Sequence, residues 1–226
     1  MRVVITGANR GIGLEFVRQY LARGDEVVAA CRDPERADAL RALACDRLRV
    51  LACDVSSDAL VAAFARELGD VAVDLVINNA GVGGGWVSLE EMDMSAALET
   101  YSVNALGPLR VSRALLPALR KAKGARVVSV SSGMGSIGDN ASGGAYAYRM
   151  SKAALNMAGK SLAIQLRAES IVSVVINPGW VATDMGGEGA PLRVEDSVGA
   201  MIPRFDALTL EDTGRFLNYR GDDYAW

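Results

Sequence analysis

The chain has 226 residues, a length that one large domain accounts for. Half of its residues are hydrophobic and its formal net charge is −3, so wholesale disorder is excluded and no basic footprint for nucleic acid is present. It contains no histidine, which excludes hydrolases built on Ser-His-Asp or Cys-His sets and zinc sites with histidine ligands.

Short apolar runs alternate with helical patterns along the whole chain. The expected strands are residues 3–5, 27–30, 48–52, 73–77, 127–130 and 172–176. The expected helices are residues 14–23, 35–43, 57–68, 95–119 and 146–167, with a kink at Pro108 in the fourth. This alternation is typical of right-handed βαβ crossovers and a parallel sheet. No segment resembles a linker, so residues 1–226 are expected to form one α/β domain, a three-layer doubly wound parallel sheet.

A glycine-rich turn follows the first expected strand. Gly7, Gly11 and Gly13 have the spacing G-x3-G-x-G, a variant of a dinucleotide-binding fingerprint. Glycines let main-chain N–H groups approach a pyrophosphate, and the helix that follows adds the positive end of its dipole. An ordinary glycine-rich turn can have the same spacing, but its place between a strand and a helix favours a nucleotide site.

The end of the second strand indicates which dinucleotide binds. NAD sites usually have a carboxylate there for the adenosine ribose, whereas this chain has Ala30-Cys31-Arg32. Arg32, together with Arg10, favours a 2′-phosphate through charge-assisted hydrogen bonds, although Arg32 beside Asp33 is also explained as a solvated side chain. We expect NADP(H) to be preferred, with NAD(H) possible. Asp54, after the third strand, is a candidate for the adenine amino group or for a helix cap.

Tyr148 and Lys152 are four residues apart and therefore adjacent on one helix face. A neighbouring ammonium stabilises a phenolate, so the pKa of Tyr148 is expected below its ordinary value of about 10, which suits acid–base catalysis. Such pairs are common on helix surfaces, so this one gains weight only from its partners. Ser132, after the fifth strand, can hydrogen-bond a substrate carbonyl beside Tyr148, and Ser131 is the alternative.

Two further segments close strands at the same expected edge. Asn78-Asn79-Ala80-Gly81 ends the fourth strand, where small residues let the backbone approach a cofactor, and Asn177-Pro178-Gly179 ends the sixth. Asn104 lies inside the long helix, where asparagine is a poor helix former. It either holds a water that leads to Lys152 or makes only local hydrogen bonds.

In this order, the motifs resemble those of the short-chain dehydrogenase/reductase family. They are Thr6-Gly-Ala-Asn-Arg-Gly-Ile-Gly13, Asp54, Asn78-Asn-Ala-Gly81, Asn104, Ser132, Tyr148-x3-Lys152 and Pro178-Gly179. Within the family, the chain is most similar to sniffer-type carbonyl reductases and C-factor-like proteins. That similarity lies in residues 30–33, 135–140, 143–149, 178–181 and 183–187, and it extends to Asn218-Tyr219 and Trp226.

The resemblance implies a Rossmann fold and hydride transfer between NADP(H) and a carbonyl or alcohol. It implies that Tyr148 is the proton donor, Ser132 the anchor of the substrate oxygen, and Lys152 the ligand of the nicotinamide ribose. Asn104 would complete a proton relay, and Thr183 would hold the carboxamide. The implied cofactor-binding residues are Gly7, Asn9, Arg10, Gly11, Ile12, Gly13, Arg32, Asp54, Val55, Asn79, Ala80, Gly81, Tyr148, Lys152, Pro178, Gly179, Val181 and Thr183.

The family also bears on partners and on an alternative function. It implies a small carbonyl or alcohol substrate and a homodimer or homotetramer. The similarity to C-factor-like proteins permits a signalling protein that binds NAD(P) with little turnover. Residues 83–87 and 188–198 are expected to wall the substrate pocket, with Trp86, Met134 and Trp180 as apolar candidates.

The last expectations concern compartment and redox state. No run approaches the roughly 18 apolar residues of a membrane span, and Met1 leads into a strand without the features of a signal peptide. Cys31, Cys45 and Cys53 have neither CxxC nor metal-ligand spacing, so we expect reduced thiols and no metal site. Together these features predict a cytoplasmic protein.

Overall fold

Seven strands form one sheet in the computed structural model, which describes residues 1–226. The strand order is β3-β2-β1-β4-β5-β6-β7, and all neighbouring strands are parallel. The strands are β1 Arg2–Thr6, β2 Glu26–Cys31, β3 Leu48–Ala52, β4 Leu75–Asn78, β5 Arg126–Val130, β6 Val172–Asn177 and β7 Phe216–Asn218. The helices are α1 Gly11–Arg23, α2 Asp38–Arg41, α3 Asp58–Leu68, α4 Met94–Tyr101, α5 Gly107–Leu119, α6 Tyr146–Leu166 and α7 Val194–Ala207.

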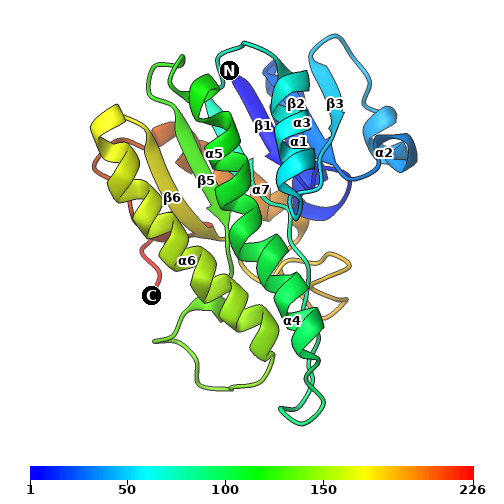
Figure 1. Ribbon diagram of the computed structural model, residues 1–226, viewed down its shortest axis with the longest axis vertical. Helices are drawn as coiled ribbons and strands as arrows, with labels where there is room; N and C mark the ends of the chain where they lie inside the picture. Colours follow the sequence, from blue (N-terminus) through cyan, green and yellow to red (C-terminus); the bar gives the residue numbers. More distant parts are fainter.

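Helices cover both faces of the sheet (Figure 1). Val3 and Ile5 of β1 pack in a cluster with buried residues of α1 and α7, whereas Val4 packs in a second cluster with residues of α3 and α5. Because successive strand residues point to opposite faces, a sheet that is covered on both sides needs apolar residues at every position. The predicted three-layer, doubly wound α/β domain is confirmed.

Two C-terminal elements were not expected, and one expected helix is much shorter. Helix α7 and the three-residue strand β7 lie beyond the last expected strand. The helix expected over residues 35–43 is reduced to a 3₁₀ turn, Pro34–Arg36, and the single turn α2. The two turns are separated because Ala37 leaves the helical region, with φ −93° and ψ 61°. None of the helices combines the length and apolar character required to cross a bilayer.

The long helix expected over residues 95–119 is interrupted at its middle. Between α4 and α5 the chain forms a π-helical turn, Ser102–Leu106, which contains Asn104. Pro108 lies two residues after this turn. A proline has no N–H, so it cannot donate the helical hydrogen bond to the carbonyl four residues earlier, which here is that of Asn104. The wider π turn relieves this conflict, so the expected kink takes the form of a π turn.

The carboxyl ends of the strands place the predicted motifs at one edge of the sheet. β1 pairs with β2 on one side and with β4 on the other, and the chain runs outward from these strands in opposite directions. Such a topological switch point leaves a crevice beyond the strand ends. The loops that follow β1, β4, β5 and β6 lie at this edge, at the lower end of the molecule in Figure 1.

Candidate functional site

The glycine loop after β1 lies directly against the end of β4. Gly7 has φ +63°, and a Cβ there would lie 2.7 Å from the Cα of Ala80. A Cβ on Gly13 would lie 2.2 Å from the carbonyl oxygen of Gly7. The Asn79 amide donates to the carbonyls of Thr6 and Gly7 at 3.0 and 3.1 Å. At the positions of Gly7 and Gly13, the loop therefore presents only backbone to a ligand at the start of α1.

The first turn of α1 has no protein group that neutralises its dipole. Arg10 is the N-cap residue and provides no side-chain cap, and the first turn contains no acidic residue. The N–H groups at this end are therefore free to face an anion. Thr183 lies against the same loop, since a Cβ on Gly11 would lie 3.4 Å from its methyl carbon.

Arg10 and Arg32, which were predicted to bind a 2′-phosphate, have different surroundings. The Arg10 guanidinium pairs with Asp184 at 2.8 Å, and both side chains are exposed, so the pair contributes little stability. Arg32 is exposed at the end of β2 and takes part in none of the ion pairs, while nearby Arg36 pairs with Asp33. Of the two arginines, Arg32 is the one available to a new anion.

Asp54, at the end of β3, is not the cap of α3. Ser57 caps that helix by accepting from the N–H of Leu60. Oδ1 of Asp54 accepts instead from the N–H and hydroxyl of Ser56 at 2.9 and 2.7 Å. Burial opposes its ionisation, but the Ser56 hydrogen bonds and the charges of Arg32 and Arg110 outweigh burial and lower the pKa of Asp54. The other carboxylate oxygen remains free to accept a hydrogen bond.

Lys152 is a buried cation with few partners. Its side chain projects from α6 into the interior, where the residue is 4% exposed, and Nζ donates to the carbonyl of Val130 at 2.9 Å. An ammonium has three donors, and this carbonyl is the one protein acceptor within hydrogen-bond distance. Burial lowers the pKa of Lys152 to about 8. The group therefore carries a charge at neutral pH and has donors available for a ligand.

The predicted fall in the pKa of Tyr148 is wrong for the free protein. Burial raises the pKa of the phenol, and a hydrogen bond with Ser132 only partly opposes this increase. Nζ of Lys152 lies 5.8 Å from the centre of the Tyr148 ring and donates to Val130 instead. The phenol therefore remains protonated at neutral pH.

Ser132 and Ser131 have separate roles. Ser132 is half-buried, accepts from the N–H of Met134 at 3.1 Å, and lies near enough to Tyr148 to lower the pKa of its phenol. Ser131 is buried and donates to the Asn156 amide oxygen at 2.6 Å. Of the two alternatives, the structure brings Ser132 to Tyr148 and directs Ser131 into the interior.

Asn104 makes hydrogen bonds to two segments that are distant along the chain. Its amide oxygen accepts from the N–H of Val82 and its amide nitrogen donates to the Val82 carbonyl, both at 2.8 Å. The nitrogen also donates to Ser151 at 3.0 Å. Asn104 and Lys152 both border Gly81, since a Cβ there would lie 3.2 Å from the Asn104 oxygen and 3.7 Å from the lysine nitrogen. A water-mediated link between these two groups stays a prediction.

The two segments expected to wall the substrate pocket have different surroundings. Gly84 lies against Tyr148, since a Cβ there would be 3.0 Å from the tyrosine nitrogen, and Trp86 packs near Gly144. Residues 194–198 instead begin α7, where Val198 belongs to the core and Ser197 donates to the Pro178 carbonyl at 2.7 Å. That segment supports the turn after β6 and does not line the pocket.

Two residues near Ser132 were missed at the sequence level. The hydroxyl of Tyr224 would lie 2.5 Å from a Cβ on Gly133, and it donates to Asp139 at 2.8 Å. Asn156 contacts Ser131 from α6. Neither residue belongs to a recognisable motif, and contacts so distant along the chain leave no local signal.

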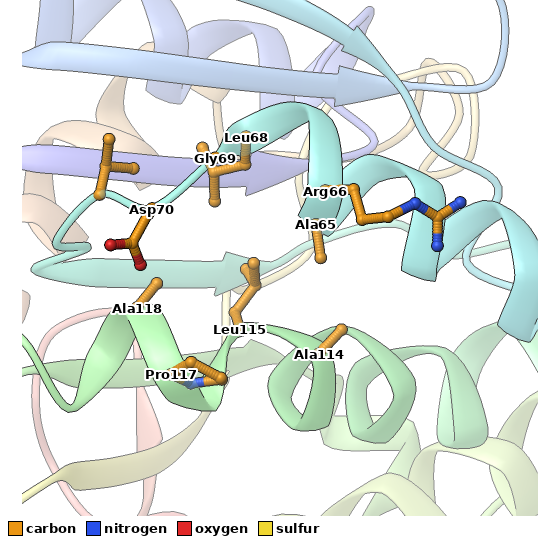
Figure 2. Close-up of a pocket in the computed structure, with 10 residues that line it drawn as sticks. Ala65, Arg66, Leu68, Gly69, Asp70, Ala114, Leu115, Pro117 and Ala118 are labelled. Carbon is orange, nitrogen blue, oxygen red and sulfur yellow. The ribbon is translucent and has the colours of Figure 1, made fainter.

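A separate cavity of about 200 Å³ lies between α3 and α5 (Figure 2). It is lined mainly by apolar residues, with Arg66 and Asp70 among them. The end of α3 and the last turns of α5 precede β4 and β5, so this cavity lies at the amino edge of the sheet, opposite the glycine loop. It contains no group from the predicted site.

Comparisons with known proteins agree with this geometry. A family model described as short chain dehydrogenase matches residues 1–191. The C-signal of Myxococcus xanthus is 51% identical over 164 residues, 73% of this chain and 99% of that protein. The structure of NADPH-bound carbonyl reductase from chicken fatty liver matches with a TM-score of 0.94 and 37% identity, over 100% of this chain and 98% of that one. Carbonyl reductase Sniffer of D. melanogaster matches with a TM-score of 0.96 and 33% identity, over 100% and 99%.

The close approach at Gly13 generates the first prediction. We expect Gly13→Ala to destabilise the fold by about 1–3 kcal/mol, because the added methyl overlaps the Gly7 carbonyl. Gly199→Ala is the control: Gly199 is exposed in α7, and a Cβ there would make only ordinary contact with the Gln19 side chain at 3.7 Å, so alanine should stabilise the helix by about 0.5–1 kcal/mol. Urea unfolding of both variants measures the difference, and equal stability of Gly13→Ala and wild type would contradict the packing described.

Proposed function

Since the chain belongs to the short-chain dehydrogenase family, as its motifs predicted, we propose that it is an NADP(H)-dependent carbonyl reductase. The observation that carries the proposal is the set formed by buried Lys152 and half-buried Tyr148 and Ser132, which lie at the same sheet edge as the glycine loop. Two carbonyl reductases share the fold over the full chain. The proposed substrates are small aldehydes, ketones or their alcohols.

The residues at the switch point suit a dinucleotide. The positions of Gly7 and Gly13 have no room for a side chain, so a pyrophosphate can approach the backbone and the free N–H groups of α1. Lys152 has unused donors for ribose hydroxyls, and Arg32 is unpaired for a 2′-phosphate. The free oxygen of Asp54 can accept from the adenine amino group. The other implied contacts of Asn9, Ile12, Val55, Val181 and Thr183 belong to the same proposal.

The protein contributes proton transfer and positioning, while the bound nicotinamide supplies the hydride. Ser132 and Tyr148 hold the substrate oxygen between two hydroxyl groups. As negative charge develops on that oxygen, Tyr148 donates its proton. The buried charge of Lys152 stabilises the resulting phenolate more strongly than it would in water. Asn104 and a water near Gly81 provide the proposed route for return of the proton.

The electrostatics of the free site favour the reducing direction. Tyr148 must be protonated to act as the acid, and burial keeps its pKa above the ordinary value. Alcohol oxidation needs the phenolate, so its rate should increase as the pH rises through the pKa of Tyr148. Lys152, with a pKa of about 8, loses its charge at a lower pH than the one at which Tyr148 ionises, so the free site does not hold a phenolate beside a charged lysine. Reduction is therefore expected to be the faster reaction at neutral pH.

A second candidate function rests on one relative. The C-signal of Myxococcus xanthus has a name that denotes a signal, and it is 51% identical over 164 residues. The alternative is a protein that binds NAD(P) and acts in signalling with little turnover. An assay of aldehydes, ketones and quinones with NADPH separates the two functions. Tight NADPH binding without oxidation by any carbonyl would favour the signalling protein.

Tyr148→Phe is the sharpest test of the proposed enzyme. The substitution removes one hydroxyl and keeps the ring, so folding and NADPH binding should survive. General acid catalysis is typically worth about 10²–10⁴-fold, and we expect kcat for ketone reduction to fall by that order. Tyr146→Phe is the matched control, because Tyr146 is an exposed tyrosine in the first turn of the same helix. If Tyr148→Phe keeps most of the wild-type rate, Tyr148 is not the acid.

Arg32→Asp tests cofactor choice. The carboxylate repels a 2′-phosphate and can accept from a ribose hydroxyl, so the preference should reverse from NADPH to NADH. Loss of a charged hydrogen bond is worth about 1.5–3 kcal/mol, which corresponds to a decrease in NADPH affinity of about 10- to 100-fold. Fluorescence titration with each nucleotide measures both dissociation constants. Arg36→Asp, on a nearby exposed arginine, should change neither; equal wild-type affinities for NADH and NADPH would refute the preference.

An exposed apolar surface on α4 and α6 supports the proposed homo-oligomer. Met150, Met157 and Ile164 are exposed on α6, each seven residues from the next, and they form one stripe. Met94 and Leu98 are exposed on α4, which packs beside α6 (Figure 1). A second copy that presents the same helices across a twofold axis would cover both sets of side chains. We propose a homodimer or homotetramer built on this surface.

Met157→Glu tests the proposed assembly. A carboxylate at the centre of the stripe should be buried without a partner in the oligomer, so the variant should be monomeric. Light scattering at micromolar concentration measures the mass. Leu60→Glu is the control, because Leu60 is an exposed leucine on α3, away from the stripe. A monomeric wild-type protein would refute the proposal.

We place this activity in the cytoplasm. All three cysteines, Cys31, Cys45 and Cys53, are free, and two of them are buried. Unpaired thiols are the normal state in a reducing compartment, where NADPH-dependent reduction also takes place.

A further inference from the structure

Asn156 connects the loop that carries Ser132 to the helix that carries Tyr148. It lies on α6, four residues after Lys152 and eight after Tyr148, so the three side chains share one side of the helix. Its amide oxygen accepts from Ser131 at 2.6 Å, and its amide nitrogen donates to the carbonyl of Gly135 at 3.1 Å. The two contacts lie on either side of Ser132.

The loop after β5 packs directly against α6, with no space for a side chain at Gly135. A Cβ on Gly135 would lie 2.8 Å from the backbone carbon and the Cβ of Lys152. Asn156 and Ser131 are each 3% or less exposed, so neither can replace a lost partner with bulk water. An asparagine is the side chain of this length that offers one acceptor and one donor at the same time. Aspartate accepts but does not donate, and leucine does neither.

We propose that Asn156 is a positioning residue: it sets Ser132 against Tyr148 through Ser131 and Gly135, and it does not touch the substrate. The Ser132 hydroxyl lowers the pKa of Tyr148, so it lies near the phenol although the loop and the helix that carry the two groups are distant along the chain. Without Asn156 the loop keeps its packing at Gly135 and one long hydrogen bond to α6, in which the Arg149 guanidinium donates to the carbonyl of Met134 at 3.4 Å. A misplacement of about 1 Å of a catalytic group can cost about 100-fold in rate. The inference rests on the proposed function, in which both hydroxyls hold the substrate oxygen.

Asn156→Ala and Ser131→Ala test the proposal from both sides of one hydrogen bond. We expect each to lower kcat for ketone reduction by about 10- to 100-fold, with the KM for NADPH unchanged within about twofold, because the nucleotide contacts are untouched. The double variant should lose little more than either single variant, because both remove the same contact. Ser131→Ala removes a single oxygen, so it tests the positioning role of Asn156 by itself if Asn156→Ala does not fold.

Ser112→Ala is the matched control for a purely structural role. Ser112 is a fully buried serine of α5 that accepts from the Asn78 amide at 3.1 Å, so its loss also leaves a buried amide group unpaired. It should lower the melting temperature to a degree similar to Ser131→Ala while it leaves kcat within about twofold of wild type. Equal kcat values for Ser112→Ala and Ser131→Ala would overturn the proposal.

Crystal structures of the variants provide a readout that does not depend on turnover. The close approach of the Ser132 hydroxyl to the Tyr148 phenol should be lost in Asn156→Ala and Ser131→Ala and kept in Ser112→Ala. If it is kept in all three, Asn156 does not position Ser132. If the wild-type protein reduces no carbonyl, the proposed function fails, and the crystal structures still decide whether Asn156 places Ser132.

Discussion

The pairing of β1 with β4 is the constraint on which the site depends. These strands are distant along the chain, and their parallel pairing brings the glycine loop next to Asn79 and Ala80. The backbones approach so closely that the positions of Gly7 and Gly13 admit no side chain. The same pairing creates the switch point, because the chain proceeds from it to both edges of the sheet. The proposed phosphate site and the fold topology therefore have a common origin.

The second determinant is the burial of charge and hydroxyl groups beside that crevice. Lys152 is held inside with one carbonyl partner, and the phenol of Tyr148 is held in its neutral form. Burial is unfavourable for a charged group unless a partner compensates, and Lys152 uses one of its three donors. A polar ligand that accepts hydrogen bonds from the unused donors would stabilise the buried charge. In the free protein the phenol is therefore protonated, and the proposed reaction requires stabilisation of the phenolate only as it proceeds.

Two buried asparagines on neighbouring elements support these groups. The π turn at Asn104 follows from Pro108, and it brings the amide to Val82 and Ser151. Asn156 similarly joins the segment after β5 to α6. Both are buried asparagines whose acceptor and donor are satisfied together. Removal of either should affect the position of other groups more than the chemistry of its own side chain.

The sequence by itself determined the family, the layered α/β fold and the identity of the residues at the sheet edge. Those features are encoded locally: apolar runs with two periodicities, glycine spacing, and Tyr148 four residues before Lys152. Only the tertiary structure decided which serine meets Tyr148, that Arg10 pairs with Asp184, and that the pKa of Tyr148 is raised. These properties arise from burial and from contacts between distant segments, and neither has a local pattern. Helix α7 and strand β7 were likewise not evident from the sequence, because short elements are stabilised by the core on which they pack.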